Sequence, residues 1–227
     1  MARLSSIFTP GYAVRAPLAR WLAEEARLAG ERERRPRLLD VGCGVRPYEH
    51  LFTPSVAEYI GVDIANPSAD LEGTVEEIPV PDSSFELVLC TQTLEHALDP
   101  ARAVRELRRL AAPGGRVLVS THGVQVYHPN PVDLWRWTHA GLERLFRENG
   151  DWSAVTVTPG SGTAACLGML VATYIHLVAK RAHVRPLSVP LVGAVNTAAR
   201  AIDAASRDLR EPRPGTIFAN YHMVAEP

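Results

Sequence analysis

The stretch from Leu38 to Gly44 constrains the fold more than any other part of the chain. An apolar run reaches the acidic residue Asp40 and then breaks into Gly42-Cys43-Gly44. Strands that are buried in parallel sheets read as apolar runs, and glycine allows the sharp turn and the close ligand approach that follow. The stretch therefore predicts a parallel strand that ends in a ligand-binding loop. A dinucleotide fingerprint would place a third glycine where this chain has Pro47, which argues against a pyrophosphate cradle.

A second strand is predicted over residues 59–64, and it ends in the acidic residue Asp63. Asp63 follows Asp40 by 23 residues, close to the ~20 expected where an acid binds a ribose. A carboxylate accepts two hydrogen bonds side by side, so it can hold both hydroxyls of a ribose. Asp63 is the predicted ribose ligand, and the alternative is a cap on a helix or turn.

The remaining pattern alternates strands and helices. Helices are predicted over residues 12–30 and from residue 46 onward. A third helix is predicted to begin at Asp99-Pro100 and to end at the turn formed by residues 112–115. A fourth is predicted to be capped by Thr138 and to end at residue 149. Strands are predicted over 87–90, 116–120 and 152–158. This alternation predicts an α/β fold, doubly wound, with a mostly parallel seven-stranded sheet and helices on both faces. The first helix either caps a cofactor pocket or packs on the sheet edge.

Five segments together resemble class I S-adenosylmethionine (SAM)-dependent methyltransferases, most closely the type-11, ubiquinone-biosynthesis-like branch. They are Leu39–Gly44, Gly61–Asp63, Phe85–Val88, Leu94–His96 and Pro113–Arg116, within a resemblance that covers residues 38–157. The resemblance implies a Rossmann-like fold and SAM as cofactor. It implies cofactor contacts from Asp40, Gly42, Cys43, Gly44, Asp63, Ile64, Thr91 and Gln92. Where the family has an acid that contacts the adenine amino group this chain has Thr74, so Thr74 or a backbone group is expected there.

A polar and aromatic loop follows the predicted fifth strand and is expected to form the acceptor wall. The predicted acceptor-binding residues are Tyr127, His128, Asp133, Trp135, Arg136 and Trp137. The two tryptophans share a face if the segment is extended. Arg136 either holds an anionic group on the acceptor or pairs with Asp133. The loop also resembles a subgroup of the type-11 branch that is associated with cell-surface glycan or lipid pathways.

Methyl transfer is an in-line displacement in which the protein aligns the reacting groups, and a hydroxyl acceptor also needs a base. His128 is the first candidate base and His122 the second. His96 is third, and a structural hydrogen bond is the favoured interpretation for it. No metal site is predicted, because no ligand spacing in the chain supports one.

The formal net charge is −1, which excludes a strong general attraction to nucleic acid. No Asn/Asp-Pro-Pro-Tyr/Phe motif follows the fourth strand, so nucleic-acid methylation is disfavoured as well. The three cysteines are widely spaced and odd in number, so no disulfide framework is predicted. Nothing at the N-terminus resembles a signal peptide. A cytoplasmic protein is expected, with membrane association left open.

A helical hairpin is predicted before the last strand, which is placed at residues 216–225. Its helices are residues 164–179 and 191–207, separated by Pro186 and Pro190. The first is too short for a membrane span, which needs about 20 apolar residues. The hairpin is interpreted as a lid, a homodimer surface, a peripheral membrane contact through 164–179, or plain core packing.

The whole chain is therefore predicted to be a single domain. Its parts are an N-terminal helical cap (1–36), a SAM-binding core (37–158), a helical insertion (159–212) and the last strand (213–227). The predicted function is SAM-dependent methyl transfer, at oxygen, to a small molecule or a sugar- or lipid-linked intermediate. The alternative is a SAM-fold binding or regulatory protein without transferase activity. A nicotinamide dehydrogenase is disfavoured by Pro47.

Overall fold

The computed structural model describes residues 6–64 and 66–227. The chain divides into two compact units. The first unit comprises residues 1–20, 123–127 and 158–221, and the second comprises 21–122, 128–157 and 222–227. The predicted cap includes residues 1–5, which lie outside the described part of the chain.

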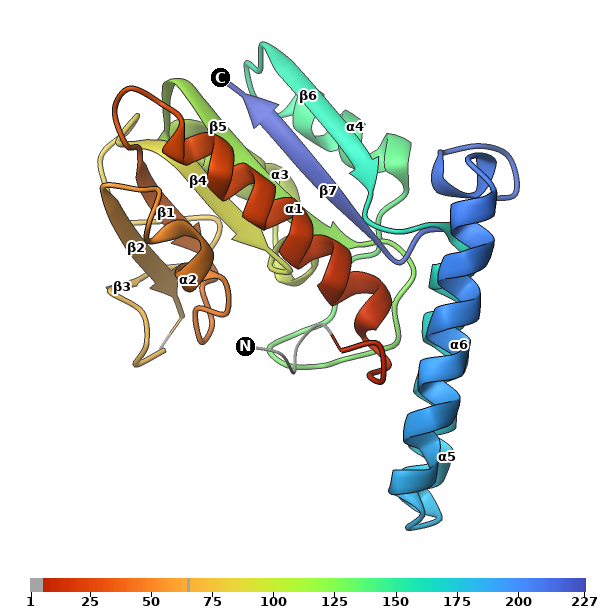
Figure 1. Cartoon of the computed structure of the whole chain (residues 1–227). Helices are drawn as coiled ribbons and strands as arrows, with labels where there is room; N and C mark the ends of the chain where they lie inside the picture. Colours follow the sequence, from red (N-terminus) through yellow and green to blue (C-terminus); the bar gives the residue numbers. More distant parts are fainter. Residues whose placement is uncertain (1–5, 65) are drawn as a thin grey trace. The chain divides into compact units, whose positions relative to one another are not determined.

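The second unit is built on a seven-stranded sheet in the order β3-β2-β1-β4-β5-β7-β6 (Figure 1), and the ends of β6 and β7 extend into the first unit. The strands are β1 (Arg37–Val41), β2 (Glu58–Asp63), β3 (Leu71–Glu72), β4 (Phe85–Thr91), β5 (Ala111–His122), β6 (Ala154–Pro159) and β7 (Asn220–Glu226). The strand order reverses between β1 and β4, as in doubly wound sheets. The predicted fold class is confirmed.

The central strands pair in parallel, which explains their continuous apolar sequences. In β1, Asp40 lies opposite Gly61 of β2 and Leu89 of β4. β7 runs antiparallel to β6. The N–H of Ser153 donates to the carbonyl of Glu226 at 2.8 Å, and the N–H of Gly160 donates to the carbonyl of Asn220 at 2.9 Å. Figure 1 shows the β7 arrow opposed to those of β4 and β6.

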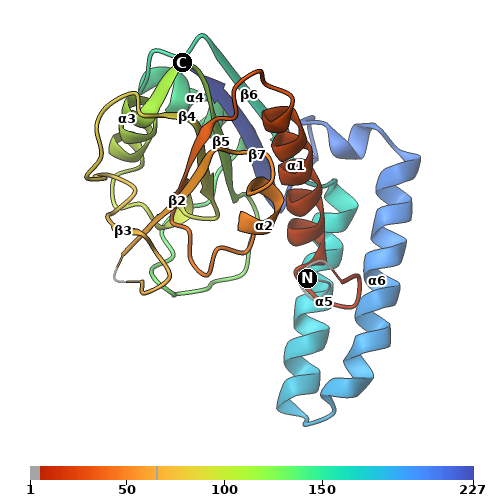
Figure 2. The same ribbon diagram turned by 60° about the vertical axis from the view of Figure 1, so that its left-hand side comes forward.

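Helices cover both faces of the sheet (Figure 2). They are α1 (Tyr12–Gly30), α2 (Glu49–Phe52), α3 (Pro100–Leu110) and α4 (His139–Glu148). The chain also has two 3₁₀ turns in its described part, η1 (Leu94–His96) and, in the first unit, η2 (Asp208–Arg210). The second half of α1 lies with α2 on one face, and α3 lies with α4 on the other. Both predicted caps are confirmed. Asp99 accepts the N–H of Arg102 at 3.0 Å, and Thr138 accepts the N–H of Gly141 at 3.0 Å.

Among the element boundaries that differ from the predicted ones, three have a clear local reason. α2 begins at Glu49 rather than at residue 46, because Arg46 has a φ of 52°, which no α-helix contains. β5 begins already at Ala111, because a bulge opposite Phe85–Leu87 takes Pro113–Gly115 into the strand. β7 begins at Asn220 rather than at 216, because the N–H of Thr216 closes a turn on the carbonyl of Arg213.

The first unit contains the predicted helical hairpin, formed by α5 (Thr163–Arg181) and α6 (Arg185–Ala205). Figures 1 and 2 both show the two helices antiparallel and side by side. Only residues 182–184 separate them, so the expected separation at Pro186 and Pro190 was wrong. Pro186 occupies the first turn of α6, where a missing N–H costs nothing, and Pro190 lies inside the helix.

The hairpin is closed at its base by a cap that comes from the other helix. Both carboxylate oxygens of Asp203 in α6 accept N–H groups at the start of α5, from Ala164 and Ala165, each at 2.9 Å. Farther along, a Cβ on Gly168 would lie 2.9 Å from the side chain of Ala199, so the helices approach closely there. The Asn196 side-chain amide donates to the carbonyls of Ile7 and Thr9 and ties these two residues to α6.

Candidate active site

A cavity of about 450 Å³ opens at the carboxyl ends of β1, β2 and β4. In an open α/β sheet this edge, at the point where strand order reverses, is where ligands bind. The volume falls in the range of small-molecule sites. The lining residues are Gly42, Gly44, Asp63, Ile64, Gly73, Thr74, Val75, Glu76, Gln92, Thr93, His96, Leu98, Asn130, Pro131 and Val132.

The glycine turn after β1 forms one wall of this cavity. Its first two N–H groups, from Gly42 and Cys43, donate to the carbonyl of Val62 at 2.8 and 3.1 Å. Gly42 has a φ of +71°, and a Cβ there would lie 2.3 Å from Oγ1 of Thr93. The turn thus packs directly against the segment that follows β4, and only glycine fits at this position.

Asp63 makes the capping contacts that were the alternative interpretation of its position. Its carboxylate accepts the N–H of Gly44 at 2.7 Å and the N–H of Ile64 at 2.7 Å, so it caps both turns. The same side chain lines the cavity. A carboxylate offers about four acceptor positions, which leaves capacity for a ligand hydroxyl. Its predicted contact with a ribose stays a prediction.

Six of the nine predicted cofactor residues line the cavity: Gly42, Gly44, Asp63, Ile64, Thr74 and Gln92. Asp40, Cys43 and Thr91 are not among the lining residues. Asp40 is buried, and its Oδ2 accepts the hydroxyl of Tyr59 at 2.5 Å. Burial raises the pKa of Asp40 to about 7 and that of the Cys43 thiol to about 11. Both side chains therefore lie behind the glycine turn, in the protein interior.

Several lining residues were not predicted from the sequence. Thr93 comes two residues after the end of β4, and a position just after a strand end is the sequence signal that could have identified it. Leu98 and Ile64 form an apolar rim, and their side chains are 80% and 60% exposed. No sequence signal identifies Leu98, which comes seven residues after the end of β4 and follows the turn η1.

The predicted acceptor loop is tied to the segment that follows β4. The backbone N–H groups of Leu134 and Trp135 both donate to the carbonyl of Glu95 at 3.1 Å. The indole N–H of Trp135 donates to the carbonyl of Ala97 at 2.7 Å, and the N–H of Trp137 donates to the carbonyl of His122 at 2.9 Å. The two indole rings stack with centroids 5.7 Å apart and planes 19° apart, as expected for an extended segment. Tyr127 is exposed and lies in the first unit.

His128 is held at the edge of this loop by an acidic partner. Its Nδ1 lies 3.4 Å from Oδ2 of Asp133, and its backbone N–H donates to the same oxygen at 3.1 Å. Arg136 binds both oxygens of Asp133, at 2.5 and 2.7 Å. These bonds, first of all the one from Arg136, hold the pKa of Asp133 well below its usual range. Arg136 therefore makes the ion pair that was its alternative role.

A buried Glu95–His122 pair lies beside His128. Nε2 of His122 is 3.1 Å from Oε1 of Glu95, whose other oxygen accepts the hydroxyl of Thr121 at 2.8 Å. Burial raises the pKa of Glu95 to about 7. Burial lowers the pKa of His122 to about 3, with a further contribution from positive neighbours including His128. The His122 side chain is 8% exposed against 33% for His128, which makes His128 the better placed base.

Ligand atoms of Glu95, His122 and His128 all lie within 4.8 Å of one another, as in groups that could hold a metal ion. The three residues come from three separate segments, so no local spacing in the sequence reveals them. The nearby His96 binds the carbonyl of Val132 through Nδ1, the structural bond that was the favoured interpretation. His96 is the last residue of the turn η1.

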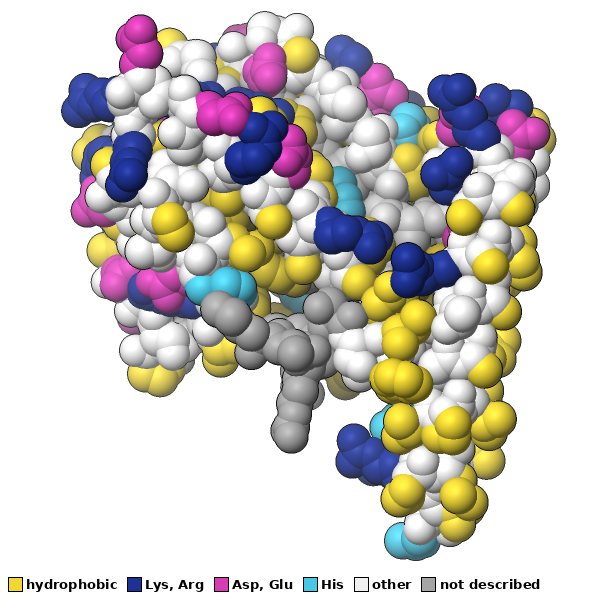
Figure 3. Space-filling model, viewed as in Figure 1, with side chains coloured by type: hydrophobic (Ala, Val, Ile, Leu, Met, Phe, Trp, Pro, Cys, Tyr) yellow, Lys and Arg dark blue, Asp and Glu magenta, His cyan; other side chains and the backbone are white. Residues whose placement is uncertain are grey.

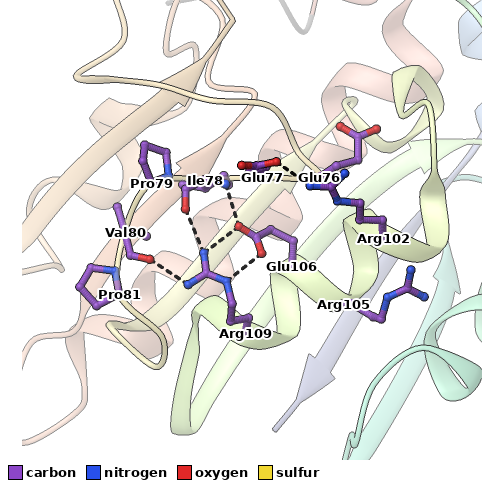
Figure 4. A pocket seen from close by; sticks show the side chains of 10 residues that line it. All are labelled: Glu76, Glu77, Ile78, Pro79, Val80, Pro81, Arg102, Arg105, Glu106 and Arg109. Carbon is purple, nitrogen blue, oxygen red and sulfur yellow. Dashed lines mark hydrogen bonds and ion pairs between the residues drawn. The ribbon is translucent and has the colours of Figure 1, made fainter.

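A second cavity, between the segment 76–81 and α3, is closed by its own ion pairs (Figure 4). The Arg109 guanidinium points at its wall and donates to the carbonyls of Ile78 and Val80 at 2.9 and 2.8 Å. It also pairs with Glu106 at 2.7 Å, and Arg102 pairs with Glu77 at 2.5 Å. Arg102 and Arg109 already have carboxylate partners, and Arg105 donates to the side-chain oxygen of Asn149 at 2.8 Å, so this cavity is a poor site for an anionic ligand.

A family model described as a methyltransferase domain matches residues 13–151, more than half of the 227-residue chain. The chain is 32% identical over 102 residues to the uncharacterized methyltransferase YcgJ of Bacillus subtilis (38% of this chain, 40% of that one). It is 32% identical over 135 residues to the ubiquinone biosynthesis O-methyltransferase of Pseudomonas aeruginosa (51% of this chain, 55% of that one). The chain thus spans about half or less of these curated relatives.

Solved structures show the same fold at low sequence identity. The crystal structure of YcgJ matches with a TM-score of 0.53 and 20% identity, covering 90% of this chain and 97% of that one. The [4+2]-cyclase SpnF matches with a TM-score of 0.56 and 18% identity, covering 94% and 82%. Phosphoethanolamine N-methyltransferase 2 of Haemonchus contortus, solved with SAM, matches at 0.55 and 12%, covering 96% and 58%.

Proposed function

Because this chain belongs to the class I SAM-dependent methyltransferases, we propose that it transfers a methyl group from SAM to a hydroxyl oxygen. The acceptor is a small molecule or a sugar- or lipid-linked intermediate. The observation that carries the proposal is the His128–Asp133 pair, which stands near the cavity at the carboxyl ends of β1, β2 and β4. His96 lines that cavity, and its ring centroid lies 5.3 Å from that of His128.

The residues present in the cavity fit SAM. The turn at Gly42 has no Cβ, so ligand atoms can approach the backbone closely. Asp63 offers a carboxylate at the end of β2 for the ribose hydroxyls. Ile64 and Leu98 offer exposed apolar surface for the adenine ring, with Thr74 in place of the family's acid. When bound, SAM supplies a methyl group activated by the positive sulfur.

His128 is the proposed general base. A hydroxyl oxygen becomes a competent nucleophile only as its proton leaves, and a neutral imidazole can accept that proton. Asp133 lies at Nδ1, which favours the tautomer with the proton on Nδ1 and leaves Nε2 as the acceptor. Arg136 keeps Asp133 ionised, so the proton that His128 gains is stabilised by the adjacent negative charge. Trp135 and Trp137 provide a flat aromatic surface beside this base.

Oxygen as the methylated atom is supported by two observations. An amine acceptor with a free lone pair does not need a base, whereas this site holds an oriented histidine–carboxylate pair. The match to an enzyme named ubiquinone biosynthesis O-methyltransferase points in the same direction, over half of each chain.

The experiment is a release assay for S-adenosylhomocysteine over a panel of acceptors. The panel compares catechols and other phenols, sugars with free hydroxyls, isoprenoid-linked sugars and matched amines. The proposal predicts turnover with at least one hydroxyl acceptor, and turnover with amines alone would contradict it. Loss of turnover in His128→Gln, with SAM binding retained, assigns the base.

A second candidate function is SAM-dependent binding or another reaction without methyl transfer. It is favoured by one observation: a protein named as a [4+2]-cyclase shares this fold with a TM-score of 0.56. SAM binding without release of S-adenosylhomocysteine over the whole acceptor panel would support this second function against the first.

A further inference from the structure

The α5–α6 hairpin exposes an unusually large share of apolar side chains. Of the nineteen large hydrophobic side chains that the described part of the chain exposes, ten lie between Leu167 and Ile202. In α5 they include Leu167, Val171, Tyr174 and Val178, which are spaced by four, three and four residues and so form one stripe along the helix. Monomeric proteins rarely expose apolar patches of this extent unless the patch contacts something.

The exposed stripes of the two helices face the same side. Val171, Tyr174 and Val178 of α5 line one groove together with Leu187 and Leu191 of α6. Figure 3 shows hydrophobic side chains along the length of the hairpin on the face that it presents. The hairpin therefore has a continuous apolar surface made by both helices.

The charge of this region has one sign. No Asp or Glu occurs from Trp152 to Ile202, although the chain has 25 acidic residues in all. Three cations, Lys180, Arg181 and Arg185, are exposed at the turn between the helices. An apolar face with cations at its end complements a surface that is apolar inside and anionic outside.

We propose that this hairpin docks on the surface of an anionic phospholipid bilayer. The apolar stripes enter the boundary between headgroups and acyl chains, and the three cations contact the lipid phosphates. By length and composition α5 could cross a membrane, and 39% of its apolar window is buried inside the protein. Docking on the surface is favoured over crossing, because crossing would take the cations of the turn through the hydrocarbon core.

The other occupant of such a face would be a second copy of this chain. Two hairpins meeting through these stripes would bring no carboxylate from residues 152–202 to either set of cations. A lipid surface supplies the missing negative charge. Docking on a bilayer and self-association of the chain therefore predict different experimental results for the same protein.

The first test is flotation of the full chain with vesicles of phosphatidylcholine alone or with 30–40% phosphatidylglycerol. We expect binding to the anionic vesicles that is at least tenfold stronger than to the neutral ones. Combined Lys180→Gln, Arg181→Gln and Arg185→Gln changes should weaken it on the order of a hundredfold, since each cation near an anionic surface contributes severalfold. Combined Arg20→Gln, Arg34→Gln and Arg35→Gln changes remove the same charge elsewhere and should leave binding within twofold.

The apolar face is tested with Val171→Gln, Val178→Gln and Leu187→Gln together, because glutamine preserves helix propensity. We expect at least a tenfold loss of vesicle binding at an unchanged far-ultraviolet circular dichroism spectrum. A readout that needs no variant uses Lys180, the only lysine in the chain. Anionic vesicles should slow its acetylation by an N-hydroxysuccinimide ester at least fivefold, as measured by mass spectrometry.

Equal binding to neutral and anionic vesicles, or no binding to either, would overturn the proposal. Unchanged acetylation of Lys180 in the presence of bound vesicles would also overturn it. If the wild type is a dimer that the three glutamine changes convert to a monomer, without vesicle binding, the face is a surface for self-association instead.

Discussion

The Nδ1 atom of His128 lies 3.4 Å from Oδ2 of Asp133, and Arg136 holds both oxygens of that carboxylate. The arrangement is a histidine oriented by an acid, with the acid itself fixed by a cation. Its proposed consequence is a histidine with its proton on Nδ1, so that Nε2 is the proton-accepting atom of the base. All three residues lie in one short loop, so their geometry does not depend on how the two units are arranged.

Replacing the proposed base should affect the chemical step and leave cofactor binding intact. We expect His128→Gln to lower kcat by about 10²- to 10⁴-fold, the usual contribution of a general base. The SAM dissociation constant, measured by calorimetry, should stay within twofold. His50→Gln, at an exposed position of α2, is the matched control and should keep full activity. Full activity of the His128 variant would assign the proton transfer to another group.

The glycine turn offers a comparison between two glycines with almost the same backbone angle. Gly42 and Gly114 have φ values of +71° and +72°, but only at Gly42 would a Cβ collide with a neighbour, 2.3 Å from Oγ1 of Thr93. Both alanine variants carry the left-handed backbone cost of about 1–2 kcal/mol. We expect Gly42→Ala to lose a further 1–3 kcal/mol or so of unfolding free energy from overpacking. Urea unfolding measures the unfolding free energy of both variants. Equal losses in Gly42→Ala and Gly114→Ala would show that the turn at Gly42 relaxes freely.

Glu95 should make stability depend on pH in a definite direction. Its pKa is raised by burial from 4.5 to about 7, so the folded state holds a proton that the unfolded state releases at lower pH. The stabilising contribution of Glu95 to the unfolding free energy is therefore fully present below pH 4.5. As pH rises from 4.5 to 7, the unfolding free energy falls by about 3 kcal/mol. His122, with a pKa of about 3, titrates mostly below this range.

The variant Glu95→Gln removes that ionisation. We expect the unfolding free energy of the variant to rise relative to wild type between pH 5 and 8, by up to about 3 kcal/mol. Urea unfolding at several pH values measures this difference. Glu33→Gln, at an exposed site, should show no such trend. A difference that stays constant or falls with pH would contradict the raised pKa.

Trp135 should contribute to the acceptor wall through one hydrogen bond and one stacked ring. Trp135→Phe keeps an aromatic ring against Trp137 but removes the indole N–H that donates to Ala97 at 2.7 Å. We expect a loss of about 1 kcal/mol in unfolding free energy and a higher KM for the acceptor at an unchanged SAM affinity. Trp152→Phe is the control, because its buried indole N–H has no hydrogen-bond partner among the described residues. Equal effects of the two changes would argue against a specific role for Trp135.

Features that depend on one short segment could be predicted from the sequence. The helix caps at Asp99 and Thr138 formed as expected, because a cap needs only residues three positions apart. The predicted element boundaries were wrong where a single backbone angle determines where an element begins. The left-handed Arg46 delays α2, and the bulge at Gly114 extends β5.

The residues of the candidate site also fall into two groups: those that a local sequence pattern predicts and those that only the packing of distant segments brings together. Residues at strand ends, such as Gly42 and Asp63, were predicted because parallel strands bring their carboxyl ends to one edge. The Glu95–His122 pair was not, since its members lie 27 residues apart and only the packing of η1 on β5 brings them to 3.1 Å. The role of Arg136 was left open between an acceptor anion and Asp133, a choice that only side-chain geometry decides.

The central claim is that this cavity binds SAM through the acid at the end of β2. The most direct measurement is calorimetric binding of SAM and of S-adenosylhomocysteine to wild type, to Asp63→Asn and to Glu58→Gln. Glu58 stands at the opposite end of the same strand and serves as the control. The account predicts that wild type and Glu58→Gln bind both ligands alike, and that Asp63→Asn binds them about 10- to 100-fold more weakly through loss of charged hydrogen bonds. Folded wild-type protein that binds neither ligand, or an Asp63 variant with wild-type affinity, would contradict it.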